Sequence, residues 1–266
     1  MSNRLVIVFG ANGGVGSMLM PCLVGHQDLK VVTCGRKQWA SDAPHYDWSF
    51  GEEPPISRII EDHADSEAVI ALYSAIVWPQ CAEDVEKNIS AFTSVASALP
   101  EGASLISLSS LVVETQSATH YANLKRREES VCHAYGGTSL RLGMIDSNQP
   151  FGQTRMFARL AGLFHMVPVP FPRASVILSK EADIASAVLG MIEGKQENTS
   201  QVVEVRSSEM SFIEAIKHIL HRHKLKFICI PIPDLITNGL LVACEKLAPN
   251  SWLSERLHGL QAFSRS

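Results

Sequence analysis

A tyrosine and a lysine four residues apart, Tyr121 and Lys125, form a pair that could move protons. Residues 121–134 have a helical pattern, and four-residue spacing puts both side chains on one face of a helix. A phenol with an ordinary pKa of about 10 is a poor base at neutral pH. A neighbouring ammonium group favours the phenolate and lowers the pKa of the phenol. The spacing therefore predicts a general acid/base pair.

Hydroxyl groups that could hold a reacting oxygen lie shortly before this helix. The segment Ser107-Leu108-Ser109-Ser110 ends a strand predicted over residues 104–108. In open α/β sheets, ligands bind at the carboxyl ends of the strands. Ser110 is the first candidate for this role and Ser109 the second. Alternatively, either hydroxyl only caps backbone groups at the strand end.

The elements that must position these residues alternate along the first two-thirds of the chain. Helical patterns follow short apolar runs, which predicts an α/β fold with a doubly wound parallel sheet of the Rossmann type. The expected strands cover residues 5–9, 30–34, 68–73, 104–108 and 138–143. The expected helices between them cover residues 14–24, 82–99 and 121–134.

The pattern changes in the last third of the chain. Residues 1–145 are expected to form a dinucleotide-binding Rossmann core. Residues 146–266 are expected to combine a small substrate-binding lobe with returning core elements, in a single compact unit. Prolines make residues 167–172 an extended segment. Elements are expected at 182–192 (helix), 201–205 (strand) and 211–221 (helix), then a strand and a helix within 227–244.

A glycine-rich turn, Gly10-Ala11-Asn12-Gly13-Gly14-Val15-Gly16, joins the first strand to the first helix. Gly10 permits a tight turn, Gly13 lets the backbone approach a pyrophosphate, and Gly16 lets the helix pack on the sheet. The amino end of the helix offers unpaired N–H groups to phosphates. The turn predicts binding of a nicotinamide dinucleotide, the alternative being a turn without a ligand.

The residues after the second strand bear on which dinucleotide is bound. A site that prefers NAD places an acid near this strand end, to bind the ribose 2′-hydroxyl. Here the strand is followed by Arg36 and Lys37, which can meet a 2′-phosphate. The sequence therefore favours NADP(H) over NAD(H), unless both cations are only solvated surface groups. Asp47, in the third strand, is a candidate for hydrogen bonding to adenine or is a turn residue.

Together these segments resemble the short-chain dehydrogenase/reductase superfamily, in its extended or atypical branch of epimerases, dehydratases and reductases. The resemblance is strongest over residues 4–145. It is carried by the glycine turn, the Leu-Ser-Ser strand end, the Tyr121/Lys125 pair, Leu140-Arg141-Leu142-Gly143-Met144 and Glu181-Ala182-Asp183-Ile184-Ala185.

The resemblance implies a role for each candidate. Tyr121 would be the general acid/base, Lys125 would hold the nicotinamide ribose, and Ser110 would position the substrate oxygen. Asn88 lies near a position where the family often carries asparagine. Two departures concern the substrate. Ser110 and Tyr121 are only 11 residues apart, and residues 73–77 lack the expected small-residue pattern beside the nicotinamide.

The expected function is that of an NADP(H)-dependent oxidoreductase, epimerase or dehydratase. Its substrate would be a small polar carbonyl compound or alcohol, with nucleotide sugars as one class. The alternative is a non-catalytic dinucleotide-binding regulator or an accessory subunit. Such regulators commonly lose the Tyr/Lys pair, whereas this chain keeps it.

Composition and residue spacing limit the kinds of binding partner that are expected. A net charge of −4 speaks against a nucleic-acid surface. Six scattered cysteines favour a reduced, cytoplasmic protein. Prolines interrupt residues 227–244, so no membrane span is expected. His218 and His221 stand at no metal-site spacing and are expected on a solvated basic face. A small-molecule substrate is expected, and a homodimer is compatible with the sequence.

Overall fold

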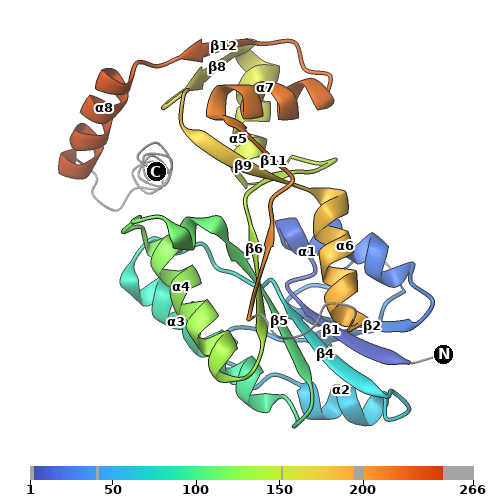
Figure 1. Cartoon of the computed structure of the whole chain (residues 1–266). Helices are drawn as coiled ribbons and strands as arrows, with labels where there is room; N and C mark the ends of the chain where they lie inside the picture. Colours follow the sequence, from blue (N-terminus) through green and yellow to red (C-terminus); the bar gives the residue numbers. More distant parts are fainter. Residues whose placement is uncertain (1–2, 40–41, 151, 195–200, 248–266) are drawn as a thin grey trace. The chain divides into compact units, whose positions relative to one another are not determined.

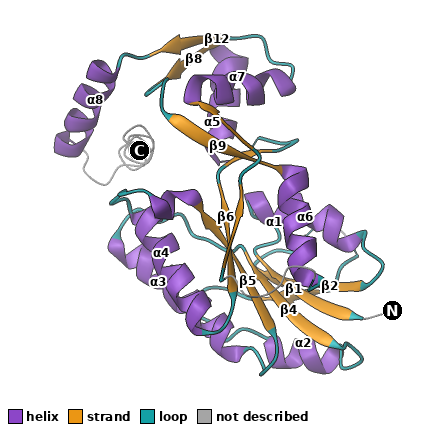
Figure 2. Cartoon of the chain, in the orientation of Figure 1, coloured by secondary structure: helices purple, strands orange, loops and turns teal. Residues whose placement is uncertain are grey.

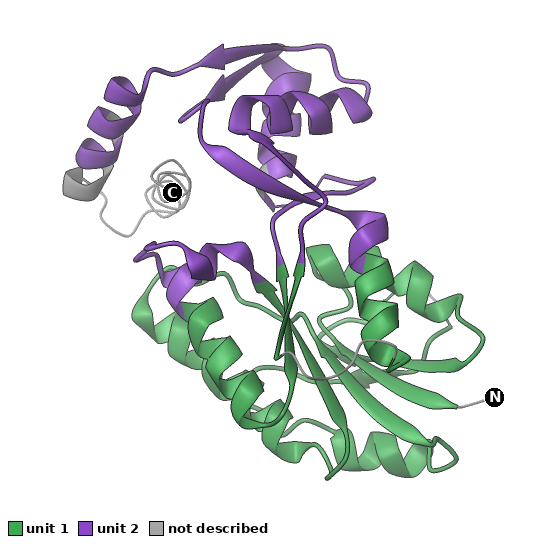
Figure 3. Ribbon diagram, viewed as in Figure 1, with its two compact units in different colours: residues 1–109, 124–141, 185–204 green, residues 110–123, 142–184, 205–266 purple. Residues whose placement is uncertain are grey.

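The structure is a computed structural model that describes residues 3–39, 42–150, 152–194 and 201–247 (Figure 1). The chain divides into two compact units that interleave along the sequence (Figure 3). Unit 1 contains residues 1–109, 124–141 and 185–204, and unit 2 contains residues 110–123, 142–184 and 205–266. The boundary that the sequence suggested at residue 145 therefore does not separate the two units: unit 1 includes residues 185–204, and unit 2 includes residues 110–123.

Unit 1 is built on a seven-stranded sheet (Figure 2). Its strands are β1 (Arg4–Phe9), β2 (Leu29–Gly35), β3 (His45–Asp47), β4 (Ala68–Tyr73), β5 (Ser104–Ser110), β6 (Thr138–Leu142) and β10 (Val202–Val205). Their order in the sheet is β10-β6-β5-β4-β1-β2-β3. β1 pairs in parallel with β2 and β4, and β4 pairs in parallel with β5. This order confirms the doubly wound Rossmann-type fold.

The sequence of β1 explains its central place in this sheet. Leu5 through Phe9 form an unbroken apolar run, and all five side chains are fully buried. Such a run suits a strand that is covered on both faces, as the central strand of a parallel sheet is. Phe9 therefore ends inside the sheet's carboxyl edge, between β4 and β2, and the glycine turn begins directly after it.

The helices of unit 1 bury apolar stripes against the sheet. They are α1 (Gly14–Val24), α2 (Ile56–Asp62), α3 (Ala82–Ala98) and parts of α4 (His120–Ala134) and α6 (Glu181–Ile192). Ile56 and Ile59 of α2 join Phe92 and Val95 of α3 in one buried cluster with alternate residues of β1. The aromatic rings of Tyr73 and Phe92 lie 4.6 Å apart in this cluster.

Unit 2 has a core of its own. Its strands are β7 (Met144–Asp146), β8 (Met166–Val169), β9 (Ser175–Lys180), β11 (Ser208–Ser211) and β12 (Ile228–Pro231). Its further helices are η1 (Leu111–Glu114), α5 (Gly152–Phe164), α7 (Phe212–Arg222) and α8 (Asp234–Leu247). The strands form sheets of order β11-β9-β7 and β12-β8. Phe157 of α5 packs on Phe212 of α7, with ring centroids 5.9 Å apart.

The structure tests two expectations for the last third of the chain. The segment predicted to be extended over 167–172 is extended only as far as Val169, where β8 ends; Phe171 beyond it has φ +45° and lies in a bend. Residues 227–244 contain β12 followed by α8, as expected. Among the described residues, no helix is both long and apolar enough to cross a membrane.

Candidate functional site

The glycine turn after β1 is packed so closely that side chains are excluded at two of its glycines. Gly10 has φ +88°, a left-handed conformation that favours glycine. A Cβ at Gly10 would lie 2.6 Å from the Ala75 nitrogen, and a Cβ at Gly16 would lie 2.2 Å from the Gly10 carbonyl oxygen. The amide of Gly13 donates to that same oxygen at 2.8 Å. Backbone packing therefore requires glycine at positions 10 and 16 of this turn.

The amino end of α1 is open to a ligand. Gly13 is its N-cap and has no side-chain capping bond, and no acidic residue stands in its first turn. Asn12, Gly13 and Gly14 are exposed. The first N–H groups of a helix lack partners within the helix, and the helix dipole adds positive potential there. The residues at this end, Gly14 and Val15 included, can thus hold an anionic group such as a pyrophosphate.

Ser74, which sequence reasoning did not single out, stabilises the glycine turn through hydrogen bonds to its backbone. It directly follows β4, and its hydroxyl donates to the carbonyl oxygens of Phe9 at 2.9 Å and Gly10 at 3.2 Å. The Gly10 carbonyl is therefore held by several bonds. The only signal in the sequence is a small hydroxyl residue at the end of the neighbouring strand.

Asn12 links the glycine turn to the end of the second strand. Its side-chain amide donates to the Lys37 carbonyl oxygen at 2.5 Å. Arg36 and Lys37 follow β2 and are both exposed. The structure thus brings the phosphate-binding candidates and the two cations to one edge of unit 1. Whether these cations bind a 2′-phosphate stays a prediction.

Asp47 lies at the same edge. It is the last residue of β3 and is in register with Gly35, the residue before Arg36. Its side chain is 95% exposed, and its carboxylate lies 3.5 Å from the imidazole of His45. An exposed acid beside Arg36 and Lys37 can reach a ribose or an adenine. Its predicted contact with adenine stays a prediction.

The two candidate serines of β5 differ in their surroundings. The Ser109 hydroxyl is buried and donates to Glu129 at 2.6 Å, so it belongs to the interior of unit 1. Ser110 begins unit 2 as the N-cap of η1, where its hydroxyl accepts a bond from the Val112 amide at 3.3 Å. That capping bond is the alternative foreseen for Ser110, and it leaves the hydroxyl hydrogen for another acceptor.

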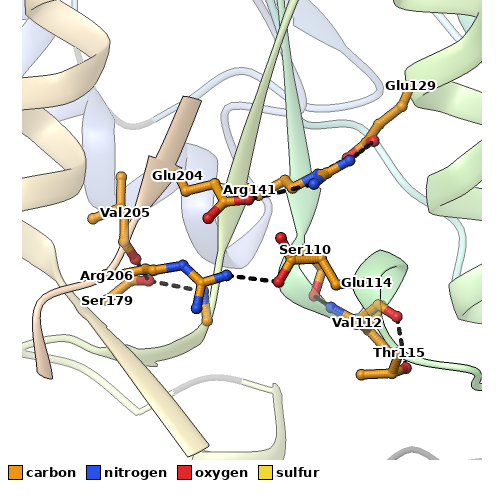
Figure 4. Close-up of polar contacts among 11 residues, drawn as sticks. Ser110, Val112, Glu114, Thr115, Glu129, Arg141, Ser179, Glu204, Val205 and Arg206 are labelled. Atoms are coloured by element: carbon orange, nitrogen blue, oxygen red, sulfur yellow. Dashed lines mark hydrogen bonds and ion pairs between the residues drawn. The ribbon is translucent and has the colours of Figure 1, made fainter. Parts of the chain in front are cut away.

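A partly buried ionic network lies next to Ser109, and Figure 4 shows Arg141 between the carboxylates of Glu129 and Glu204. The guanidinium of Arg141 donates to both oxygens of Glu129, at 2.9 and 2.8 Å, and to Glu204 at 3.3 Å. Planar bidentate pairs of this kind fix geometry strongly. Arg141, noted in the sequence only for its resemblance, therefore ties α4 to β6 and β10.

Tyr121 and Lys125 lie one turn apart on α4, as the spacing predicted. Lys125 is buried, and its ammonium donates to the Leu108 carbonyl oxygen at 2.9 Å and to Glu128 at 2.6 Å. Burial raises the pKa of the Glu128 carboxyl, and the Lys125 ammonium opposes that rise. The contact with β5 places the Lys125 ammonium at the carboxyl end of this strand. Glu128 was missed because a glutamate on a helix ordinarily indicates a solvated face.

Asn88 binds backbone groups of the loop before α3, a role that the sequence did not reveal. It is fully buried in α3, and its amide oxygen accepts from the Val77 amide at 2.9 Å. Its amide nitrogen donates to the carbonyl oxygens of Val77 and Asp84. These bonds fix the loop between β4 and α3, which carries the exposed Ile76 and Val77.

His218 and Arg222 of α7 form a polar cluster with Asp146 in unit 2. His218 and Arg222 both contact the buried carboxylate of Asp146, at 3.1 and 2.9 Å. The basic face expected here is therefore anchored by an acid that the sequence analysis did not identify. Over the described residues, no group of histidine, cysteine, aspartate or glutamate side chains could hold a metal ion. Five cysteines are free thiols, and the Cys244 side chain lies outside the described ones.

Comparisons with known proteins support the fold. No protein-family model and no curated protein matches the sequence. The structure resembles L-threonine dehydrogenase from Phytophthora infestans, with a TM-score of 0.68 and 15% identity, over 86% of this chain and 85% of that one. It resembles Helicobacter pylori ADP-L-glycero-D-manno-heptose-6-epimerase, with a TM-score of 0.66 and 16% identity, over 87% and 86% of the two chains.

A third solved structure is similar over nearly its whole length. It is the dTDP-glucose 4,6-dehydratase of Bacillus anthracis, solved in complex with NAD. Its TM-score is 0.67 at 11% identity, with 99% of this chain and 97% of that chain covered. At such low identities the likeness is one of fold. The chain has the Rossmann-type fold on which these dehydrogenase, epimerase and dehydratase structures are built.

Proposed function

We propose that the protein is a nicotinamide-dinucleotide-dependent oxidoreductase, epimerase or dehydratase. The observation that carries the proposal is the glycine turn, where backbone packing excludes side chains at Gly10 and Gly16 beside an uncapped helix end. A pyrophosphate fits this end because backbone N–H groups and the helix dipole both favour an anion. The three similar structures are, by their names, a dehydrogenase, an epimerase and a dehydratase, which supports the same class.

The proposed cofactor is NADP(H) rather than NAD(H). Arg36 and Lys37 follow β2 and are exposed, as residues that contact a 2′-phosphate must be. The similar dehydratase was solved with NAD, so the preference rests on these two cations of this chain. The exposed carboxylate of Asp47 competes with them, because an acid at this edge suits a ribose hydroxyl.

The proposed catalytic residues are Tyr121, Lys125 and Ser110. The dinucleotide, when bound, supplies a group that exchanges hydride with a substrate carbon. Tyr121 would transfer the proton to or from the substrate oxygen through its phenolic oxygen. The Lys125 ammonium would favour the phenolate and hold the nicotinamide ribose, while Ser110 would donate a hydrogen bond to the same substrate oxygen.

The proposed substrate is a small polar carbonyl compound or alcohol, with nucleotide sugars as the first class to test. The similar epimerase and dehydratase carry nucleotide-sugar names, which supports this choice. The proposal also places the protein in the cytoplasm, in line with free thiols at five described cysteines. A homodimer is proposed as its assembly, to be checked by light scattering.

The test is a turnover assay with a panel of nucleotide sugars, amino alcohols and simple secondary alcohols. Nicotinamide reduction is followed by absorbance, and product formation by mass spectrometry. The proposal predicts turnover of at least one member, and a loss of about 100-fold or more in Tyr121→Phe. Tyr135→Phe is the matched control, because Tyr135 is an exposed tyrosine near the other end of α4. Equal turnover by wild type and Tyr121→Phe would refute the assigned chemistry.

If the protein binds the nucleotide tightly and turns over no member of the panel, the result would favour the second candidate function. That candidate is a dinucleotide-binding regulator. A buried Lys125 that contacts β5 speaks for catalysis, because a regulator has no need of an ammonium at this strand end.

A further inference from the structure

The ion pair between Lys125 and Glu128 lies entirely inside unit 1. The side chains are 8% and 1% exposed, and the ammonium and carboxylate are 2.6 Å apart. Burying a charge without a partner costs several kcal/mol. Each of the two groups therefore requires the other, and the contact fixes the otherwise flexible Lys125 chain.

The charges around this pair show which cation balances which carboxylate. The neighbouring Glu129 is already paired bidentately with Arg141 of β6 and accepts from Ser109 of β5. The other titratable groups that act on Glu128 or feel it are the phenol of Tyr73 on β4 and the thiol of Cys132 on α4. Both are neutral at physiological pH, since burial raises the pKa of each. Lys125 is therefore the cation that compensates Glu128.

One carboxylate oxygen of Glu128, Oε1, is buried and has no hydrogen-bond partner among the described residues. A carboxylate kept inside a protein with one oxygen unsatisfied is a net cost to stability. A buried polar atom without a partner calls for an explanation, and a role in a functional site is one such explanation.

We propose that Glu128 is a positioning residue for Lys125. It holds the ammonium against the Leu108 carbonyl at the carboxyl end of β5, and its negative charge limits how strongly that ammonium favours the Tyr121 phenolate. This inference rests on the proposed function, since it assigns Glu128 a part in the same proton transfer. It predicts that Lys125 acts as half of a neutral pair rather than as a full positive charge.

The expected effect follows from Coulomb's law. Glu128 and Tyr121 are seven residues apart on α4, so about 10 Å of helix separates them. At an effective dielectric constant of about 20, a unit charge at that distance shifts a titration by about one pH unit. Removing the Glu128 charge should therefore let Tyr121 ionise at a lower pH.

The experiment needs no substrate. Tyrosine ionisation is followed by near-ultraviolet absorbance from about pH 7 to about pH 11. The absorbance titration of each protein is recorded with and without the Tyr121→Phe substitution. The difference between the two curves is the ionisation curve of Tyr121 alone. Tyr46 and Tyr73 interfere little, because burial raises the pKa of Tyr46 to about 12 and that of Tyr73 well above its ordinary range. Glu128→Gln is compared with wild type and with Glu86→Gln. The second variant breaks an exposed ion pair between Glu86 of α3 and Arg127 of α4, the helix that carries Glu128.

The expected result is a midpoint about one pH unit lower in Glu128→Gln and unchanged in Glu86→Gln, where solvent screens the charge. Glu128→Met is a second neutral variant, to be used if the Glu128→Gln protein does not fold. It also removes the unpartnered oxygen. Unchanged midpoints in a folded neutral variant would overturn the role of Glu128. Calorimetric titration of the same proteins with NADPH and NADH keeps the two proposals apart. Absence of nucleotide binding in wild type would refute the proposed function, whatever the tyrosine titration shows.

Discussion

The glycine turn allows a sharp test through Gly16→Ala. In the structure, a Cβ at this position would lie 2.2 Å from the Gly10 carbonyl oxygen and 2.9 Å from the Ser74 hydroxyl. Real Cβ atoms essentially never come within 3.0 Å of such neighbours, so α1 or the turn must shift by about 1 Å. The Gly10 carbonyl cannot simply rotate away, because the Gly13 amide and the Ser74 hydroxyl both donate to it.

The magnitude is a balance of two terms. Alanine in place of a helical glycine gains about 1 kcal/mol of helix propensity. Forcing a methyl group into a filled space costs about 1–3 kcal/mol. We therefore expect Gly16→Ala to lower the free energy of unfolding by up to about 2 kcal/mol. Because the amino end of α1 moves with the turn, we expect affinity for the dinucleotide to fall at least about tenfold, which is 1.4 kcal/mol.

Gly162→Ala is the matched control. It makes the same substitution inside α5 of unit 2, where a Cβ would meet nothing within 4 Å. This variant should be more stable than wild type by about 0.5–1 kcal/mol and should bind the nucleotide normally. Urea unfolding and calorimetry measure both quantities. If Gly16→Ala is as stable as Gly162→Ala and binds as tightly, the packing argument for the turn is refuted.

Three further predictions concern other parts of unit 1. Arg36→Ala should weaken NADPH binding about tenfold or more and leave NADH binding nearly unchanged, as calorimetry would show; equal losses for both would contradict a 2′-phosphate contact. Tyr46 donates to Asp62 at 2.8 Å, and burial raises its pKa to about 12, so its share of stability is present below about pH 10 and lost as pH rises toward 12. Tyr46→Phe should flatten the decline of unfolding free energy over that interval, and an unchanged decline would count against the assignment. Asn88→Ala leaves both polar groups of Val77 unpaired and should cost about 2–3 kcal/mol in urea unfolding, whereas a cost below about 0.5 kcal/mol would show that water replaces the amide.

Local patterns in the sequence predicted most of the Rossmann sheet. The unbroken apolar run of β1 and the glycines after it form a pattern that can be recognised within one short segment, although the atoms that exclude a side chain at Gly10 belong to Ser74 and Ala75. The predicted helix over 14–24 and strand over 68–73 match α1 and β4 residue for residue. The strand over 104–108 was too short, because β5 continues through Ser109 and Ser110. Hydroxyl residues are ambiguous at a strand end, where they also favour turns.

Two of the interactions that sequence reasoning missed join segments far apart in the chain. Ser74 lies 64 residues from Gly10, and Asp146 lies 76 residues from Arg222. No periodicity or motif encodes such pairs. Glu128 was missed for a different reason, since a charged residue on a helix is ordinarily solvated and only the packed structure reveals that this one is buried. The sequence indicated that elements after residue 145 return to the core, but the exact residues of each unit depend on contacts that only the folded structure shows.

The central claim is that the glycine turn of unit 1 binds a nicotinamide dinucleotide. Its most direct test is calorimetric titration of the cofactor-stripped wild-type protein with NADPH and with NADH, side by side. The account predicts one-to-one binding of at least one of them with micromolar affinity or better, tighter for NADPH. No binding of either nucleotide by a folded protein would contradict it, and the glycine turn would then be a structural feature alone.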